Sequence, residues 1–377
     1  RYLYGHSPDI GHLPDLTAPV YGRYRTYGHR WLIGLRFQHG WNSRLLSVIL
    51  GKGVLHMEFT VAQDGSGDFP SVQKCVDAIP ADFEGPVGIF IRKGRYKEKL
   101  DIAKPSVTLI GEDEEKTILT YDDCAEKRMP DGGKMGTFRS YSTRITGEGF
   151  RAENITFENA AGQKGGVGQA LAAYVDADKV CFRNCRFLGF QDTLFTGPPP
   201  QDAGDLEWMK KEEIRRNGRN RQLYDNCYLE GDVDFIFGSA TAVFRKCEIF
   251  SKNRDKKVNG YITAASTPES RQYGYVFMDC QLTGDAGPQS VYLGRPWRKY
   301  AKVAFLDCQM GSHIIGEGWN NWRDWEREKT VTYVEYNSSG PGAKRQKRVS
   351  WSRCLTPEEA SKYQLENIFP ENNSWYI

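Results

Sequence analysis

Asn184-Cys185-Arg186-Phe187 and Asn226-Cys227-Tyr228-Leu229 are two copies of a short pattern that recurs along the chain. The pattern is a polar residue, a cysteine or isoleucine, a variable residue and an apolar residue. In a β-strand its second and fourth positions face the same side. The cysteines of successive copies are 42, 20, 33 and 28 residues apart, an irregular period near the length of one coil of a β-solenoid. The other copies are Glu153-Asn154-Ile155-Thr156-Phe157, Lys246-Cys247-Glu248-Ile249, Asp279-Cys280-Gln281-Leu282 and Asp307-Cys308-Gln309-Met310.

This repeat predicts an all-β fold of stacked parallel coils with few helices. In such a stack Cys185, Cys227, Cys247, Cys280 and Cys308 would form one interior column. Redox or metal-binding thiols are the alternative, but burial as small hydrophobic side chains is the commoner role of free cysteine. The chain has no CxxC pair that would indicate zinc, and nine cysteines in 377 residues do not suggest a disulfide scaffold.

Both ends of a solenoid need covers, because an open coil exposes unpaired backbone groups. Near the start, residues 71–79 carry apolar side chains at helical spacing and stop at Pro80, which predicts a short N-terminal capping helix. Near the other end, Thr356-Pro357-Glu358-Glu359 is a capping box that predicts a C-terminal helical tail. Residues 198–221, which include a triple proline, predict a loop excursion with a short helix.

The first 56 residues differ from the rest of the chain. They contain seven basic and two acidic residues, which leaves 44 basic against 46 acidic residues in the remainder. The overall net charge of +3 is therefore poor evidence for a nucleic-acid partner. We expect residues 1–56 to be a disordered or artefactual extension and residues 57–377, beginning at Met57, to form the protein proper. A genuine flexible extension is the alternative.

Carboxylates are the natural candidates for proton transfer in this chain. Five of the six histidines lie in residues 1–56 and only His313 lies outside them, so a Ser-His-Asp relay or a His-rich metal site is poorly supported. Three segments stand out instead: Gln191-Asp192-Thr193-Leu194, Asp234-Phe235-Ile236-Phe237-Gly238 and Leu293-Gly294-Arg295-Pro296-Trp297. Two aspartates and one arginine, each among apolar or aromatic neighbours, resemble an acid/base pair with a cationic partner.

The spacing of these residues predicts a row on one external face. Gln169 precedes Gln191 by 22 residues, and Asp192 precedes Asp234 by 42, which is again about one coil once the 198–221 excursion is removed. Neighbouring coils lie about 4.8 Å apart. Two carboxylates so close cannot both ionise cheaply, and an Arg295 paired with Asp234 would make Asp234 the nucleophile and Asp192 the acid. The two Gln amides would supply oxyanion donors.

Each of these residues also has a structural interpretation. Asp192 can be a turn residue, Asp234 a buried structural carboxylate, and the Arg295 segment a packed turn. Their joint spacing at one-coil intervals favours the catalytic interpretation.

The chain from about Phe59 to Tyr376 resembles the pectin methylesterases, aspartyl esterases whose fold is a single-stranded right-handed parallel β-helix. Gly94-Arg95-Tyr96-Lys97-Glu98 is similar to the family's GxYxE and Gln169-Ala170-Leu171-Ala172-Ala173 to QAVAL, while QDTL, DFIFG and LGRPW are unaltered. The resemblance implies that Asp234 is the nucleophile, Asp192 the general acid and then base, and Arg295 the residue that orients Asp234.

The resemblance also implies that Gln169 and Gln191 line the oxyanion site and that Trp297 and Phe235 bind sugar rings, with a core position as the alternative for both aromatics. Gly94, Tyr96 and Glu98 are expected to be structural. Asp232 is a departure from the family pattern, expected by strand alternation on the same face as Asp234. There it would either raise the pKa of Asp234 or meet solvent.

We therefore expect an esterase that hydrolyses galacturonosyl methyl esters in pectin or its oligomers and releases methanol, without a metal or cofactor. We expect a monomer with no nucleic-acid or membrane partner. A pectic substrate favours an extracellular or cell-envelope location, but no signal peptide is visible, so the cytoplasm stays open. A polysaccharide hydrolase or lyase on the same solenoid, which would cleave the chain, and a non-catalytic binding solenoid are the alternatives.

Overall fold

The computed structural model describes residues 25–27, 30–32, 47–51, 54–163, 167–199, 220–370 and 373–376. The chain contains two compact units, Arg1–Glu58 and Phe59–Ile377. In the first unit β1 (Arg25–Tyr27) pairs antiparallel with β2 (Arg30–Leu32). Strand β3 (Ser47–Gly51) pairs antiparallel with β4 (Val54–Val61), whose last residues belong to the second unit. That residues 1–56 are an artefactual extension stays a prediction.

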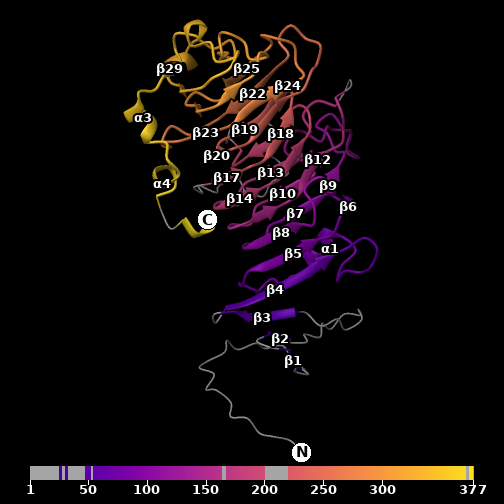
Figure 1. The fold of residues 1–377 in the computed structure, drawn as a ribbon. Coiled ribbons are helices and arrows are strands. Elements are labelled where there is room, and N and C mark those ends of the chain that lie inside the picture. The colour runs from indigo at the N-terminus through magenta and orange to yellow at the C-terminus, as the bar shows by residue number, and fades with distance from the viewer. Residues whose placement is uncertain are drawn as a thin grey trace, which may run out of the picture. The chain divides into compact units, whose positions relative to one another are not determined.

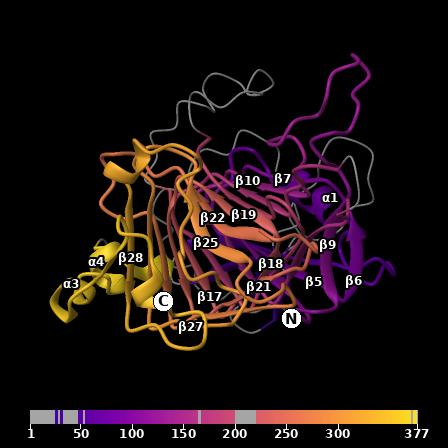
Figure 2. The same cartoon turned by 90° about the horizontal axis from the view of Figure 1, so that it is seen from above.

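The second unit is a parallel β-helix, as the repeat and the resemblance predicted. The chain passes through three parallel sheets in turn and contributes one strand to each sheet per coil, so each inner strand pairs with its counterparts in the coils before and after (Figure 1). Figure 2 looks down this stack.

The strands of the β-helix form three sheets. Sheet 1 contains β7 (Leu100–Ile102), β10 (Thr143–Ile145), β13 (Ala173–Val175), β16 (Leu194–Thr196), β19 (Val233–Gly238), β22 (Gly260–Ala265) and β25 (Val291–Pro296). Sheet 2 contains, from β5 onward, β5 (Val87–Ile91), β8 (Val107–Gly111), β11 (Arg151–Glu153), β14 (Val180–Arg183), β17 (Arg221–Asp225), β20 (Thr241–Arg245), β23 (Tyr275–Met278), β26 (Lys302–Leu306), β28 (Thr332–Tyr336) and β29 (Arg353–Cys354). Sheet 3 contains β6 (Gly94–Lys97), β9 (Thr117–Tyr121), β12 (Thr156–Asn159), β15 (Arg186–Leu188), β18 (Tyr228–Gly231), β21 (Glu248–Ser251), β24 (Gln281–Gly284) and β27 (Gln309–Met310).

The sequence repeat marks the turn from sheet 2 to sheet 3. Its polar residue adopts a left-handed conformation, with φ of 48° at Asn184 and 53° at Asn226, which asparagine tolerates better than most residues. The Nδ2 of Asn226 donates to Oδ1 of Asn184 in the preceding coil at 2.8 Å. In each coil that carries the repeat, a single left-handed residue therefore turns the chain from sheet 2 into sheet 3. At Asn184 and Asn226 the turns of successive coils are also hydrogen-bonded to each other.

The cysteine that follows each turn points into the stack. All five repeat cysteines are buried. Their thiols donate to carbonyls of the preceding coil, for example Cys247 to Tyr224 at 3.3 Å and Cys280 to Phe244 at 3.2 Å. This confirms the predicted interior column and its structural role.

A second interior column consists of aromatic rings from sheet 2. Rings in successive coils are nearly parallel, and their centroids are 4.6 Å apart for Tyr224 and Phe244, 4.6 Å for Phe244 and Phe277, and 4.4 Å for Phe277 and Phe305. Offset stacks of this kind add to the free energy gained from apolar burial. The column fixes the vertical register of the coils that carry the site.

The predicted N-terminal helix is present as α1 (Val72–Asp77), beside β5 in Figure 1. The carboxylate of Glu98 accepts from the backbone N–H groups of Val72 and Gln73, both at 2.9 Å, and so caps the helix N-terminus. Tyr96 is buried and its hydroxyl donates to the Arg92 carbonyl at 2.9 Å. The structural role expected for Tyr96 and Glu98 is confirmed.

The C-terminal helical tail is also present, in α3 (Pro357–Ser361) and α4 (Leu365–Ile368). The capping box at Thr356 is formed. The tail does not cover the end of the stack but runs back along the outer face of sheet 2 (Figure 1). Phe369 and Tyr376 pack there against Cys181 and Leu223. The described residues also contain three 3-10 helices, Arg327–Lys329, Arg345–Lys347 and Asn373–Trp375.

Most of the predicted 198–221 excursion lies outside the described residues. Within the parts that are described, no helix is both long and apolar enough to cross a membrane.

Candidate active site

Asp192 and Asp234 occupy the same position in successive coils of sheet 1. Leu194 of β16 pairs with Ile236 of β19, so the residue two places earlier in each coil is an aspartate. The backbone N–H of Asp192 donates to the Val233 carbonyl at 3.0 Å. One coil earlier, the N–H of Ala170 donates to the Gln191 carbonyl at 3.2 Å. The segments that carry Gln169, Gln191 with Asp192, and Asp234 therefore lie in three successive coils, and that their side chains form one row stays a prediction.

Both aspartates have an unusual backbone conformation. Their φ angles are 64° at Asp192 and 51° at Asp234, in the left-handed region that non-glycine residues rarely enter. Strand β19 also carries a β-bulge, because Val233 pairs with Tyr261 whereas Ile236 already pairs with Thr263. Bulges redirect side chains and are frequent beside active sites. This local irregularity lets a charged residue leave an otherwise apolar strand.

Arg295 holds Asp234 with two hydrogen bonds. Its Nε donates to Oδ1 at 2.9 Å and its Nη2 to Oδ2 at 2.5 Å, the bidentate geometry that matches a carboxylate. The guanidinium lies between two aromatic rings, 3.9 Å from the Tyr261 centroid and 3.7 Å from the Trp322 centroid. These rings fix the plane of the guanidinium.

Both carboxylates are buried, and Arg295 is what makes their electrostatic surroundings differ. Asp192 is 7% exposed and Asp234 6%. Burial, followed by the nearby charge of Asp234, raises the pKa of Asp192 well above its usual value. Burial also raises the pKa of Asp234, but the hydrogen bonds and charge of Arg295 oppose that rise. These shifts favour the protonated form at Asp192 more than at Asp234, because only Asp234 is hydrogen-bonded to the arginine.

Asp232 lies in the bend between β18 and β19 and not in a strand. The expectation that strand alternation puts its side chain on the face of Asp234 therefore started from a wrong assignment. The residue is 2% exposed, which excludes the solvent alternative. One carboxylate oxygen accepts from the Val233 N–H at 2.6 Å and the other from Nε2 of Gln163 at 2.8 Å. Its charge adds to the rise in pKa of Asp192 and Asp234, for which burial is the largest cause.

The two aromatic residues expected to bind sugar differ. Phe235 is fully buried, so the prediction that it contacts substrate is wrong and its alternative as a core aromatic holds. Trp297 is partly buried and packs on an aromatic cluster, with its centroid 5.7 Å from that of Phe237 and 6.5 Å from that of Phe138. Trp322 joins the same cluster. Trp322 and Tyr261 were not among the predicted site residues.

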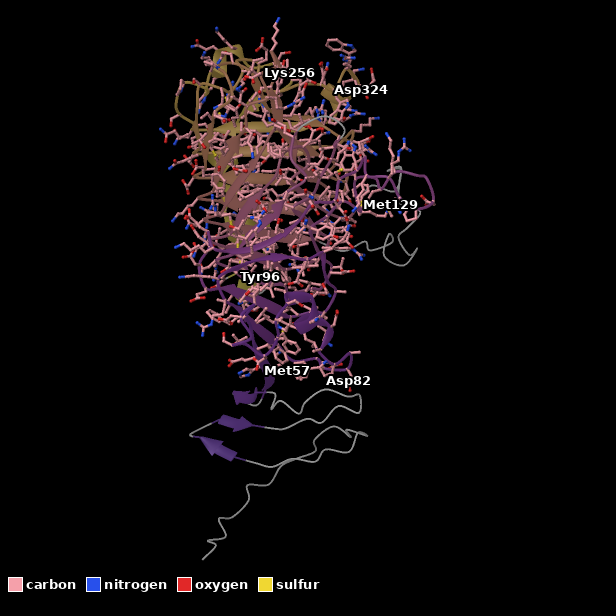
Figure 3. All side chains as sticks on the ribbon, turned by 90° about the vertical axis from the view of Figure 1, so that its right-hand side faces the viewer. Met57, Asp82, Tyr96, Met129, Lys256 and Asp324 are labelled. Atoms are coloured by element: carbon pink, nitrogen blue, oxygen red, sulfur yellow. The ribbon has the colours of Figure 1, made fainter. Side chains whose placement is uncertain are left out.

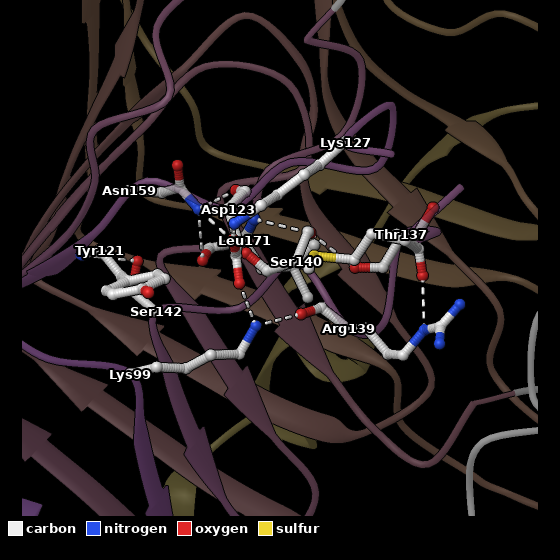
Figure 4. A network of polar contacts seen from close by, with 11 residues as sticks. Lys99, Tyr121, Asp123, Lys127, Thr137, Arg139, Ser140, Ser142, Asn159 and Leu171 are labelled. Carbon is white, nitrogen blue, oxygen red and sulfur yellow. Dashed lines mark hydrogen bonds and ion pairs between the residues drawn. The ribbon is translucent and has the colours of Figure 1, made fainter. Parts of the chain in front are cut away.

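A polar network ties the long loop 122–141 to the segment that carries Gln169. Figure 3 shows this loop, with Met129 on it, projecting from the body. Asp123 pairs with both Lys99 and Lys127 (Figure 4). The side chain of Asn159 donates to the carbonyls of Asp123, Ser140 and Leu171 at 2.9, 3.0 and 3.1 Å. The N–H of Ala125 donates to the Gln169 carbonyl at 2.8 Å. The loop therefore helps to fix the backbone of Gln169.

The described ranges contain no group of three or more His, Cys, Asp or Glu side chains arranged to hold a metal ion. The chemistry that the row itself can supply is a carboxylate nucleophile, a protonated carboxyl as general acid, and neutral amide donors beside them.

Comparisons with known proteins show to which family the chain belongs. The Pectinesterase family model matches residues 58–201 and 217–372. Pectinesterase 31 of Arabidopsis thaliana is 37% identical over 310 residues, which cover 80% of this chain and 89% of that protein. A pectinesterase of Petunia integrifolia is 33% identical over 84% of this chain and 80% of its own length.

Solved structures give the same result. The pectin methylesterase from carrot superposes with a TM-score of 0.69 at 31% identity, over 83% of this chain and 92% of that chain. The pectin methylesterase PemA from Erwinia chrysanthemi also gives 0.69, at 26% identity over 83% and 97%. On the strength of the family match, the relatives and the shared β-helix, this chain is an enzyme of the pectinesterase family, a family of carboxylic ester hydrolases.

Proposed function

We propose that this enzyme hydrolyses the methyl esters of galacturonosyl residues in pectin, with Asp234 as nucleophile and Asp192 as general acid and then base. The observation that carries the proposal is the pair of stacked aspartates of which only Asp234 is held by Arg295 through two hydrogen bonds. A similar protein of known structure, 26% identical, is a pectin methylesterase in complex with a hexasaccharide.

In the first step a carboxylate oxygen of Asp234 attacks the ester carbonyl carbon. The carbonyl oxygen becomes an oxyanion, to which the side-chain amides of Gln169 and Gln191 donate. The tetrahedral intermediate collapses, the bond to the methoxy oxygen breaks, and Asp192 gives its proton to that oxygen. Methanol leaves and an acyl-enzyme anhydride joins the galacturonosyl carbonyl to Asp234.

In the second step Asp192, now a carboxylate, takes a proton from water while the water oxygen attacks the acyl carbonyl. The bond to Asp234 breaks and Asp234 leaves as a carboxylate, Asp192 is protonated again, and the galacturonic acid product gives its remaining carboxyl proton to solvent. Asp192 thus acts first as acid and then as base, and its raised pKa suits the first of these roles.

A methanol assay on methylated pectin tests the proposal. We expect the wild-type enzyme to release methanol without forming new reducing ends or unsaturated sugars, which would instead indicate a chain-cleaving enzyme. Asp234→Asn should lower turnover by several orders of magnitude, as for other nucleophile substitutions. Asp192→Asn should lower it strongly too. A matched control is Asp225→Asn. Asp225 also accepts two hydrogen bonds from an arginine, Arg245, but both residues lie in sheet 2, away from the two site aspartates. Methanol release near the wild-type rate by Asp234→Asn would overturn the assignment.

We further propose that the enzyme meets its substrate outside the cytoplasm, because pectin is a cell-wall polymer, and that it acts as a monomer. Fractionation of the producing cells and the molar mass in solution test these two points.

A further inference from the structure

Trp325 is an exposed aromatic residue in a protein that buries most of its aromatic rings. In the described part of the chain, two large hydrophobic side chains are exposed: Val258, at 39%, and Trp325, at 71%. An indole offers one of the largest apolar surfaces of any side chain, and burying it in the fold would stabilise the protein by a few kcal/mol. Its exposure is therefore a candidate for a binding function.

The loop that carries Trp325 is held by its own hydrogen bonds on both sides of the tryptophan. Before it, the N–H of Arg323 donates to Oδ1 of Asn321 at 2.9 Å. After it, the N–H of Glu326 donates to Oδ1 of Asp324 at 3.1 Å, and Nε of Arg327 donates to Oδ2 of Asp324 at 2.9 Å. The backbone of Trp325 is thus fixed before any ligand binds, which lowers the entropic cost of binding.

The same loop is fastened to the strand that carries Arg295. The N–H of Asn320 donates to the Gly294 carbonyl at 3.1 Å, and Nη1 of Arg327 donates to the carbonyls of Pro296 at 2.5 Å and Trp297 at 3.3 Å. Trp322, three residues before Trp325, lies against the Arg295 guanidinium. Figure 3 shows Asp324, the neighbour of Trp325, at the outer edge of the body, on the same side as Met129 of loop 122–141. The loop that carries Trp325 is therefore fastened next to the Arg295 strand, with the Trp325 side chain exposed to solvent.

We propose that Trp325 is the platform of an outer subsite, on which a sugar ring of the pectin chain stacks away from the ester that reacts. This inference rests on the proposed function. The face of a pyranose ring that carries C–H groups packs well on an indole, and a polymer bound at the row must continue past one of its ends. If Trp325 forms such an outer subsite, an oligomer of two or three sugars bound at the row should not contact it.

Kinetics on substrates of two lengths test the proposal. For Trp325→Ala we expect KM on long methylated homogalacturonan to rise about 2- to 10-fold, the range of an aromatic contact, with kcat unchanged. Methylated oligomers of two or three sugars should show the wild-type KM. Trp325→Tyr keeps a ring and should recover part of the loss. Val258→Ala, at the other exposed hydrophobic residue, should behave as wild type on both substrates. An unchanged KM on the polymer, or an equal rise on the short oligomers, would refute the subsite.

Binding of the fully demethylated polymer gives a readout that does not depend on turnover. Titration of polygalacturonate into the enzyme, followed by calorimetry, should show weaker binding by Trp325→Ala than by the wild type, and equal binding refutes the subsite. If the wild-type enzyme releases no methanol from any methylated substrate, the proposed function fails. If it does, and the variant's KM and binding are unchanged, only the role of Trp325 fails.

Discussion

The pair between Arg295 and Asp234 yields the sharpest quantitative prediction. Arg295→Met removes a guanidinium that makes two hydrogen bonds to a carboxylate with 9% of its side chain exposed. Removing one partner of a buried ion pair costs about 3–5 kcal/mol, because the other charge stays buried and unpaired. Since 19% of the Arg295 side chain is exposed, we expect the lower end, about 3 kcal/mol of unfolding free energy near neutral pH.

The loss should depend on pH with a definite sign. Without the guanidinium, Asp234 loses the hydrogen bonds and positive charge that oppose the effect of burial, so its pKa rises further. The folded variant then keeps a proton that the unfolded chain releases above about pH 4. Stability falls with pH wherever the folded state binds more protons than the unfolded state. The gap between variant and wild type should therefore be small near pH 4 and grow towards pH 7. For the same reason the acid limb of the rate of methanol release should move to higher pH.

Urea unfolding at a series of pH values, together with methanol release over the same series, measures both effects. Arg295→Lys keeps the charge but not the bidentate geometry, so its loss should be smaller. Arg245→Met is the matched control, because Arg245 donates two hydrogen bonds to Asp225, at 2.9 and 2.6 Å. Its side chain is 34% exposed, and it lies in sheet 2 and not among the candidate site residues. It should cost about 1 kcal/mol and leave the rate profile in place. A gap for Arg295→Met that does not change with pH, or a rate profile that stays in place, would refute the reasoning.

Three further predictions concern single residues. Asp232→Asn removes a charge that adds to the burial-raised pKa of both Asp192 and Asp234, so the whole pH profile of methanol release should move to lower pH; an unmoved profile contradicts this. Asn226→Ala loses a hydrogen bond and puts alanine at a φ of 53°, so the free energy of unfolding measured with a denaturant should fall by about 1–3 kcal/mol. Asn226→Gly should lose less, because glycine accepts that conformation. Burial lowers the pKa of His313 to about 4, so the wild type should lose up to about 3 kcal/mol of stability as pH falls from about 6.5 to about 4, and His313→Gln should lose less over that range.

Periodic and local features of the fold could be predicted from the sequence. The Asn–Cys repeat indicates a turn and an inward side chain in each coil, and a short pattern suffices because each coil contacts mainly its neighbours. Helix caps such as Thr356 are equally local. The position of the C-terminal tail was harder, because Phe369 and Tyr376 contact strands nearly two hundred residues earlier. The sequence does indicate that sheet 2 is covered on its outer face. Strands β14 and β20 contain Val-Cys-Phe and Ala-Val-Phe, and uninterrupted apolar runs are typical of strands covered on both faces.

The candidate site could be predicted only as far as register allowed. Spacing predicted one row for Asp192, Asp234 and the two Gln residues, because one coil returns the chain to the same face, and the structure puts the two aspartates at the same position in successive coils. It gave no information on Tyr261 and Trp322, whose rings enclose Arg295 from other coils. Nor did it indicate Gln163, which binds Asp232 across 69 positions of sequence.

The backbone on either side of Phe235 explains why the alternation of side chains along a strand fails at this site. In a regular strand Asp234 would share a face with Ile236, which is fully buried, and Phe235 would face the other way. A bulge and a left-handed residue interrupt β19 between Val233 and Ile236, so Phe235 and Ile236 can both be buried while Asp234 meets Arg295. A left-handed non-glycine residue costs on the order of 1–2 kcal/mol, and such strain persists where surrounding contacts hold it. The two hydrogen bonds from Arg295 are contacts of that kind. The arginine that favours the ionised form of Asp234 therefore also helps to hold the backbone conformation that takes this carboxylate out of the core.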